Sequence, residues 1–242
     1  MTWYTGSLAP VPDARKDAFI DHAARAWPLF RQRGALRMVE TWGEDVKPGK
    51  VTDLRRAVAL QQDEVPVFSW IEWPDRATAD AAWADMMADD GVAAAMGEMP
   101  FDGGRMIFGG FAPVVAEGTD RGAGWFQGFV VPVPQGNRQA YADMARRVWD
   151  DQFRPNGCLG NFESWGEDVP RGRQTDFHRA VDARDDEAVV IAWTAWPDRA
   201  TCDAAGRAME LAMQGQPMPD MPFDGMRMAW GGFAPVFDSD RR

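Results

Sequence analysis

Carboxyl groups set among apolar residues are the part of this sequence most able to do chemistry. Alternate positions of the segment 35–42 hold Leu36, Met38, Glu40 and Trp42. The second half of the chain repeats this spacing with Leu159, Asn161, Glu163 and Trp165. Alternate residues of a β-strand share one face, so each glutamate is expected between apolar neighbours. Burial without a partner would raise the pKa of such a carboxyl group and make it a candidate general acid or base.

A structural role is the alternative for both glutamates. Arg105 and Arg227 occupy matching places on the last expected strand of each half. They are the expected ion-pair partners of Glu40 and Glu163, and a glutamate paired in this way would stabilise the fold without reacting. Arg105 is also three residues from Asp102, so these two side chains are expected to pair if Glu40 is not the partner.

Glu72 is the third carboxylate of interest, because it is present in one half only. In the segment 65–73 it alternates with Phe68 and Trp70, and its counterpart in the second half is Ala195. A reaction that needs this carboxylate would therefore take place in the first half alone. We expect Glu40, Glu72 and Arg105 to form the catalytic set if the protein is an enzyme. The alternative is that Glu72 faces solvent and is freely replaceable.

Recurring tryptophans suggest either a pocket for a planar ligand or a hydrophobic core. Trp42 and Trp70 recur as Trp165 and Trp193. A tryptophan combines a large apolar surface with an N–H that needs a hydrogen-bond partner when buried. Two polar residues, Glu163 and Arg227, could fix the orientation of such a ligand. The candidate ligand-binding residues are therefore Trp42, Trp70, Glu163, Trp165, Trp193 and Arg227.

The sequence offers few residues that could bind a metal ion or a cofactor. The acidic pairs Glu44-Asp45 and Glu167-Asp168 supply too few oxygens for a hard cation, which takes six or so. His22 and His178 correspond to Met144 and Arg55, so neither histidine recurs as a haem or zinc ligand would. The chain also lacks a glycine-rich phosphate-binding motif with a lysine. We therefore expect no metal and no cofactor.

The elements that must position these residues are written twice in the chain. Aligning residues 34–78 with 157–201 gives 24 identities in 45 positions, and 99–114 with 221–236 gives 13 in 16. A repeat this long, occurring only twice, indicates a duplicated domain. The expected organisation is a first repeat over 1–115, a linker over 116–124 and a second repeat over 125–242.

Each repeat is predicted to run β-α-β-(short α)-β-α-β. In the first repeat we expect helices over 13–33 and 76–90, with strands over 35–42, 65–73 and 104–114; the first strand is clearest in the second repeat, over 125–133. Gly34 is expected to end the first helix, and Asp75 to cap the second. This order gives an antiparallel four-stranded sheet with both helices on one face. The fold class is therefore α+β, with two ferredoxin-like βαββαβ repeats whose uncovered apolar faces pack together as an intramolecular α/β barrel.

Long motifs carry a resemblance to a known family. They are Trp42-Gly43-Glu44-Asp45-Val46, the segment Thr52-Asp53 followed by Arg56-Ala57-Val58, the run Phe68 to Pro74, and Met96 to Phe111. With their second copies, these segments resemble the bacterial domain of unknown function family 1428 (YbaA-like), over nearly all of each repeat. The resemblance implies the dimeric α/β-barrel fold, and this chain would be a fused version of such a dimer. It implies no particular activity.

Charge and composition narrow the range of partners. The net charge is −11 and is shared by both halves, so the field of the protein repels polyanions and we expect no nucleic acid or membrane partner. Cys158 and Cys202 correspond to Ala35 and Ala79, which argues against a disulfide framework. No basic segment followed by an apolar run opens the chain, and we expect a cytoplasmic protein, as a monomeric pseudo-dimer or a larger homo-oligomer.

Two functions follow from this pattern. The first is a small-molecule binding protein, or a cofactorless enzyme, that uses the barrel interior. The second is a structural or protein-interaction module with a filled core. A connected interior cavity lined by glutamate and tryptophan would favour the first, and a packed interior with Glu40 paired to Arg105 would favour the second.

Overall fold

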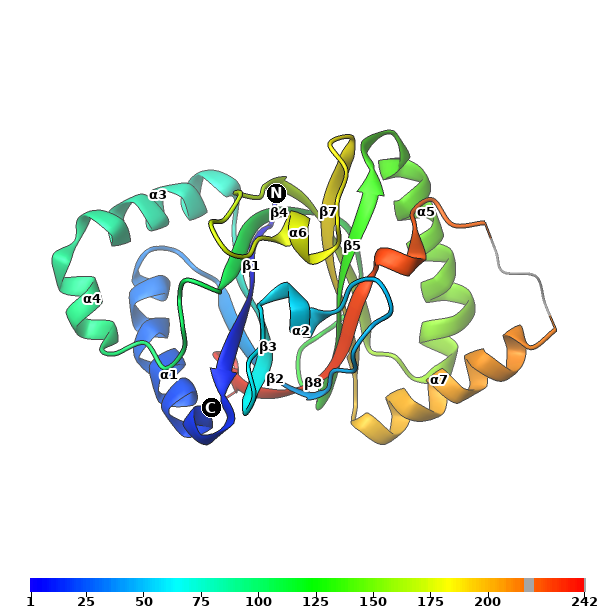
Figure 1. Ribbon diagram of the computed structural model, residues 1–242, viewed down its shortest axis with the longest axis horizontal. Coiled ribbons are helices and arrows are strands. Elements are labelled where there is room, and N and C mark those ends of the chain that lie inside the picture. Colours follow the sequence, from blue (N-terminus) through cyan, green and yellow to red (C-terminus); the bar gives the residue numbers. More distant parts are fainter. Residues whose placement is uncertain (216–219, 242) are drawn as a thin grey trace.

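A computed structural model describes residues 1–215 and 220–241, and the strands and main helices of the first repeat recur in the same order in the second (Figure 1). The first half contains β1 (Trp3–Pro12), η1 (Asp13–Arg15), α1 (Lys16–Gln32), β2 (Arg37–Asp45), α2 (Leu54–Ala57), β3 (Glu64–Trp73), α3 (Arg76–Ala88), α4 (Asp90–Met96) and β4 (Ile107–Gly118). The second half contains β5 (Trp125–Pro134), η2 (Gln135–Asn137), α5 (Arg138–Val148), η3 (Trp149–Phe153), η4 (Arg154–Asn156), β6 (Gly160–Asp168), α6 (Phe177–Ala180), β7 (Glu187–Trp196), α7 (Arg199–Met213), η5 (Gly225–Arg227) and β8 (Ala229–Asp238).

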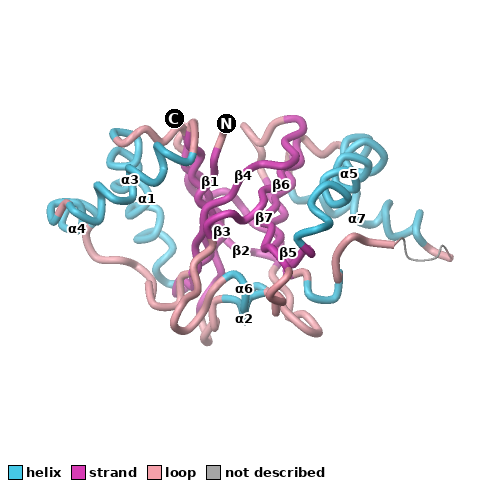
Figure 2. Tube along the Cα trace, turned by 90° about the horizontal axis from the view of Figure 1, so that it is seen from above, coloured by secondary structure: helices cyan, strands magenta, loops and turns pink. Residues whose placement is uncertain are grey.

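The strands form one closed antiparallel barrel in the order β1-β3-β2-β8-β5-β7-β6-β4. Within each half the order is that of a ferredoxin-like sheet, which confirms the expected fold class. The halves are joined edge to edge by two seams, one between β2 and β8 and the other between β4 and β6. Figure 2 shows the long helices on the two outer sides of the barrel, with the strands between them.

Local sequence explains where most of these elements begin and end. The carboxylate of Asp75 accepts a hydrogen bond from the backbone N–H of Thr78 at 2.8 Å and caps α3, as expected. Gly34 has a φ of 97°, which permits the left-handed turn that ends α1. The second helix is shorter than predicted because Asp89 interrupts it and caps α4, through a bond from the N–H of Gly91. In the described residues, no helix combines the length and apolar character needed to cross a bilayer.

The last strand of the first half lies later in the chain than predicted. Arg105 belongs to a turn, because its guanidinium and its backbone N–H both bind Asp102, so β4 begins only at Ile107. At its other end β4 continues to Gly118 because it pairs with β6 along the seam. Residues 116–118, expected in the linker, therefore lie in a strand, and the connection between the halves is 119–124.

Two different structures close the ends of the barrel. The short helices α2 and α6 lie side by side at one end and insert apolar side chains, among them Leu54 and Phe177, into the core (Figure 2). At the opposite end, where β2 begins and β8 ends, the connection 119–124 and the C-terminal residues 239–241 come together. Asp120 and Ala123 of that connection are both buried.

Aromatic side chains from both halves fill the interior of the barrel. The rings of Trp70 and Trp193 stack with centroids 4.6 Å apart, and Phe162 stacks on the other side of Trp193 at 5.3 Å. Tyr4 meets Trp193 edge to face at 5.1 Å. The two tryptophans proposed to line an interior pocket are thus the centre of a packed core, and aromatic contacts of this kind stabilise it.

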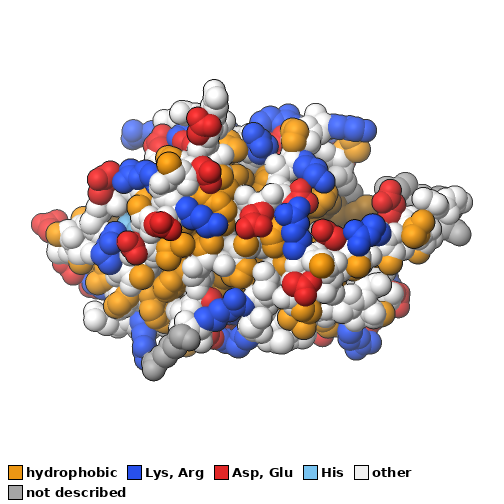
Figure 3. Space-filling view, turned by 90° about the horizontal axis from the view of Figure 1, so that it is seen from below, with side chains coloured by type: hydrophobic (Ala, Val, Ile, Leu, Met, Phe, Trp, Pro, Cys, Tyr) orange, Lys and Arg blue, Asp and Glu red, His pale blue; other side chains and the backbone are white. Residues whose placement is uncertain are grey.

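Ion pairs between the halves add to the packed core. Arg76 at the start of α3 lies 3.6 Å from Asp168, and Arg199 at the start of α7 lies 3.6 Å from Asp45. In each of the acidic pairs Glu44-Asp45 and Glu167-Asp168, the aspartate therefore forms an ion pair with an arginine of the other half. Elsewhere on the surface, acidic and basic side chains are interspersed, as on the face in Figure 3.

The halves also differ in the helix that follows their first strand. Seven positions separate Trp27 from Gly34 in the first half, whereas eight separate Trp149 from Gly157 in the second. The additional residue is accommodated by a π-helical turn, η3, which follows α5 where α1 continues without interruption. The surroundings of Trp27 and Trp149 therefore differ, and this difference affects the site described below.

Candidate functional site

The structure places the residues predicted to do chemistry on two opposite faces of the barrel wall. Glu40 and Trp42 point outward, toward α1, as do Glu163 and Trp165 toward α5. Trp70, Trp193 and Glu72 point toward the barrel interior, and Arg105 and Arg227 lie in the turns that precede β4 and β8. The candidates from the sequence therefore do not come together in one site.

Glu40 and Glu163 are bound by hydroxyl groups and not by arginines. The Ser69 hydroxyl donates to Oε2 of Glu40, and the Tyr141 hydroxyl donates to Oε2 of Glu163 at 2.6 Å. Burial raises the pKa of each glutamate to about 7, and the hydroxyl contact opposes only part of that increase. The expected pairing of Glu40 with Arg105 is wrong.

Each arginine is held instead by the first residue of another strand of its own half, β3 for Arg105 and β7 for Arg227. Arg105 binds both carboxylate oxygens of Glu64 at 2.7 Å and Oδ2 of Asp102 at 2.9 Å, so its expected pairing with Asp102 is confirmed. Arg227 binds Glu187 and Asp224 in the same way. These bidentate hydrogen bonds lower the pKa of the glutamates. Both arginines fix the turn before a strand, and neither faces a shared cavity with Glu40 or Glu163.

Glu72 lies at the charged end of the barrel. One oxygen of its carboxylate is 3.4 Å from Arg121, which also pairs with Asp240 of the C-terminal segment. Burial is the main cause that raises the pKa of Glu72, and Asp120 adds to it. Glu72 is therefore part of a chain of charges that joins the inside of the barrel to the segment 239–241.

Arg37 is the centre of this charged end, and sequence reasoning missed it. Its side chain is fully buried, and it donates to both oxygens of Asp238 at 2.9 Å and to Asp120 at 2.5 Å. The indole N–H of Trp193 donates to the other oxygen of Asp120 at 3.2 Å. Arg37 thus connects β2 to β8 and to the connection between the halves, and it holds the charged end in one arrangement.

The charged cluster belongs to one of the two seams only, the one between β2 and β8. At the matching places of the other seam stand Gly160 for Arg37 and Ala116 for Asp238, and Ala195 stands for Glu72. These substitutions were the signal in the sequence: charges that fail to recur in an otherwise similar repeat. The barrel is therefore pseudo-symmetric in its backbone and one-sided in its polar side chains.

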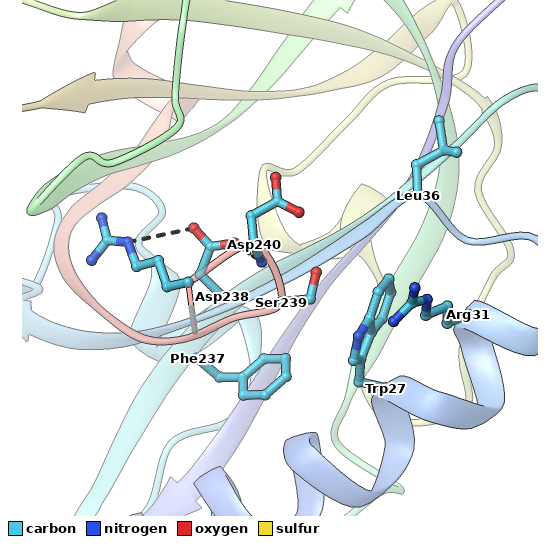
Figure 4. A pocket seen from close by; sticks show the side chains of 8 residues that line it. Trp27, Arg31, Leu36, Phe237, Asp238, Ser239 and Asp240 are labelled. Carbon is cyan, nitrogen blue, oxygen red and sulfur yellow. Dashed lines mark hydrogen bonds and ion pairs between the residues drawn. The ribbon is translucent and has the colours of Figure 1, made fainter.

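A cavity of about 650 Å³ opens beside this cluster, between the last turns of α1 and the end of β8 (Figure 4). It is lined by Trp27, Arg31, Leu36, Phe237, Asp238, Ser239, Asp240 and Arg241. Trp27 and Arg31 lie one turn apart on α1, and Figure 4 shows both facing the segment that carries Phe237 and Ser239. The carboxylate of Asp238 forms the buried wall of the cavity, and Arg37 fixes its position by donating hydrogen bonds to both of its oxygens.

The matching place in the second half is filled. Trp149, the counterpart of Trp27, is buried among Trp196, Cys158 and other apolar residues. Its ring comes so close to the backbone at Gly118 that a side chain there would lie 3.0 Å from it. The cavity beside Trp27 is consequently a feature of one place only, where α1 of the first half meets the end of β8.

A second cavity, of about 660 Å³, lies on the outside of the barrel near the start of α3 and β4. Its two cations are already neutralised, because Arg76 pairs with Asp168 at 3.6 Å and Arg138 with Glu167 at 3.2 Å. Both arginines also cover tryptophan rings, those of Trp3 and Trp165. The cavity beside Trp27 has the more available polar groups.

Solved structures with this fold extend over almost the whole chain. A candidate monooxygenase from Lactobacillus acidophilus NCFM superposes with a TM-score of 0.55 over 98% of this chain and 95% of its own, at 7% identity. An anthrone oxidase-like protein gives 0.52, over 98% and 92%, at 12% identity. At such identities the similarity is one of fold alone.

Sequence relatives are closer. The uncharacterised protein YbaA of Escherichia coli strain K12 is 48% identical over 117 residues, which are all of that protein and 48% of this chain. The family described as protein of unknown function DUF1428 matches twice, at residues 2–103 and 124–225. The chain therefore belongs to this family, with two of its domains fused into one barrel.

Proposed function

We propose that this protein binds a small organic molecule in the cavity beside Trp27, at the charged end of the barrel. The observation that carries the proposal is a space of about 650 Å³ between two aromatic side chains, Trp27 and Phe237, backed by the buried pair of Arg37 and Asp238. Ligand sites in proteins have this size and combine apolar walls with a few fixed polar groups. The fixed wall means that little has to be ordered when a ligand enters.

Binding is better supported than catalysis. The acids suggested for a reaction are separated: Glu40 faces α1, while Glu72 reaches the cavity only through Arg121 and Asp240. Aromatic side chains fill the barrel interior, where the sequence suggested that a ligand would bind. We therefore place the binding site at the end of the barrel. The structural neighbours described as monooxygenase or oxidase-like contribute a shared fold, and a fold by itself does not assign a reaction.

Removing either aromatic wall should weaken binding strongly, and the melting temperature of each variant shows whether it still folds. We expect compounds that raise the melting temperature of the wild-type protein, in a thermal-shift screen followed by native mass spectrometry, to bind at least about tenfold more weakly to Trp27→Ala and to Phe237→Ala, because each substitution removes one face of the cavity. Trp230→Ala is the matched control, since Trp230 is a half-exposed tryptophan on the outside of β8. Hits whose affinity is unchanged in both cavity variants would contradict the proposal.

A further inference from the structure

The charged groups that line the cavity beside Trp27 differ in whether they are already paired. Asp238 accepts two hydrogen bonds from Arg37 and a third from the backbone N–H of Asp240 at 3.1 Å. Asp240 pairs with Arg121, and Arg241 lies 3.6 Å from Asp238. The acids of the cavity are thus neutralised by arginines, and a cationic ligand would find no unpaired carboxylate there.

Hydrogen-bond donors remain available in the same space. The guanidinium of Arg31 is exposed and has no carboxylate within ion-pair distance in residues 1–215 and 220–241. The Ser239 oxygen accepts a bond from the backbone N–H of Met38 at 3.0 Å, which leaves its own O–H to donate. These two donors, one of them charged, face a cavity whose acceptors are occupied.

We propose that the cavity takes a planar aromatic molecule with a single carboxylate, whose ring lies between Trp27 and Phe237 and whose carboxylate pairs with Arg31. This inference rests on the proposed binding function and names its ligand class. Arg31 can meet a carboxylate with two parallel N–H donors, a geometry that a lysine cannot offer. The O–H of Ser239 is the second donor to the same carboxylate.

A monoanion fits this place better than a phosphate dianion. Arg31 is in the last turn of α1, which ends at Gln32, so the cavity lies at the negative end of the helix dipole. The overall charge of −11 adds to the repulsion of multiply charged anions. Arg241 already pairs with Asp238, so among the described residues Arg31 is the lining arginine that remains to offset one negative charge, and a second charge would stay uncompensated.

The experiment compares four probes that share one ring system, using isothermal titration calorimetry on the full chain. They are naphthalene-2-carboxylate, its neutral carboxamide, naphthalen-2-ylmethylamine and 2-naphthyl phosphate. We expect the carboxylate to bind about tenfold or more tighter than the other three, since hydrogen bonds to a charged group are roughly twice as strong as neutral ones. The preference should shrink as salt is added.

Variants at Arg31 separate this inference from the proposed function. Arg31→Gln should lower the affinity for the carboxylate to about that for the carboxamide, whose own affinity should fall much less, and Arg31→Lys should keep only part of the preference. Arg207→Ala, which removes an exposed arginine from α7, should change neither. Melting temperatures equal to wild type would show that the variants fold.

Three results would overturn the inference. If the carboxylate and the carboxamide bind equally, and both are lost in Trp27→Ala, the ligand class is wrong and the binding site stands. The same holds if the amine or the phosphate binds best. If none of the four probes, and no compound of the wider screen, binds in a manner that depends on Trp27, both proposals fail together.

Discussion

Replacing Arg37 by methionine is expected to destabilise the protein by about 3–5 kcal/mol, the usual cost of breaking a buried ion pair by removing one partner. Arg37 is the group that neutralises Asp120 and Asp238, both of which are buried. Methionine fills a similar volume, so the effect reports the charge and hydrogen bonds more than a cavity. Urea denaturation at neutral pH, followed by tryptophan fluorescence, measures the change.

A variant that neutralises Arg37 together with both of its buried carboxylate partners is the control for this interpretation. The other seam of the barrel holds Gly160 and Ala116 where this one holds Arg37 and Asp238, so an uncharged seam is compatible with the fold. Arg37→Met combined with Asp120→Asn and Asp238→Ala should therefore recover most of the lost stability. If the triple variant were as unstable as Arg37→Met alone, the uncompensated carboxylates would not be the cause.

Substituting Glu163 by glutamine should stabilise the protein at pH 8, by about 2–3 kcal/mol, and have little effect at pH 4.5. The pKa of Glu163 is raised by burial to about 7, from 4.5. Between pH 4.5 and pH 7 the folded protein therefore keeps a proton on Glu163 that the unfolded chain has already released. Stability from this group is complete below about pH 4.5 and is lost as the pH rises through 7, where the folded state carries a buried charge.

The surroundings of Glu163 favour an amide. Tyr141 can still donate its hydroxyl hydrogen to the glutamine oxygen. The new N–H₂ group lies near Asn161, whose side-chain oxygen is buried without a hydrogen-bond partner in the described residues. Denaturation of wild type and variant at pH 4.5 and 8 gives the comparison.

Glu187→Gln is the matched control, with the opposite sign. The pKa of Glu187 is lowered by its hydrogen bonds with Arg227, so the stability it contributes is present above pH 4.5 and is lost as the pH falls. Glu187→Gln should destabilise the protein at pH 8 and less so in acid. A Glu163→Gln variant that is also less stable than wild type at pH 8 would show that Glu163 gains more from its contacts than it loses by burial.

The sequence predicts the backbone of this protein well because the repeat carries local information twice. The caps at Asp75 and Gly34 and the alternation in β2 and β3 are short-range features, and they place the elements correctly. Because the two repeats have similar sequences, each is expected to leave one apolar face of its sheet uncovered, and these two faces are then expected to pack against each other. The closed barrel follows from these rules without knowledge of any single contact.

The polar site was harder to predict because its contacts join distant parts of the chain. Arg37 and Asp238 are 201 residues apart, and they meet only because β2 and β8 form a seam. The partner of Arg105 was misassigned for a related reason: Glu64 opens β3 and was not recognised as a strand residue facing that turn. The sequence does show which charged residues of one repeat have no charged counterpart in the other, and Arg37, which corresponds to Gly160, is one of them.

The stoichiometry of binding tests most directly the claim that duplication has produced a one-sided site. Native mass spectrometry of the wild-type chain with a saturating ligand from the screen should show one molecule bound per 26.9 kDa chain, and at a ligand concentration near the wild-type Kd the complex should be largely lost in Trp27→Ala. Two molecules per chain, or one that remains bound in Trp27→Ala, would contradict the account.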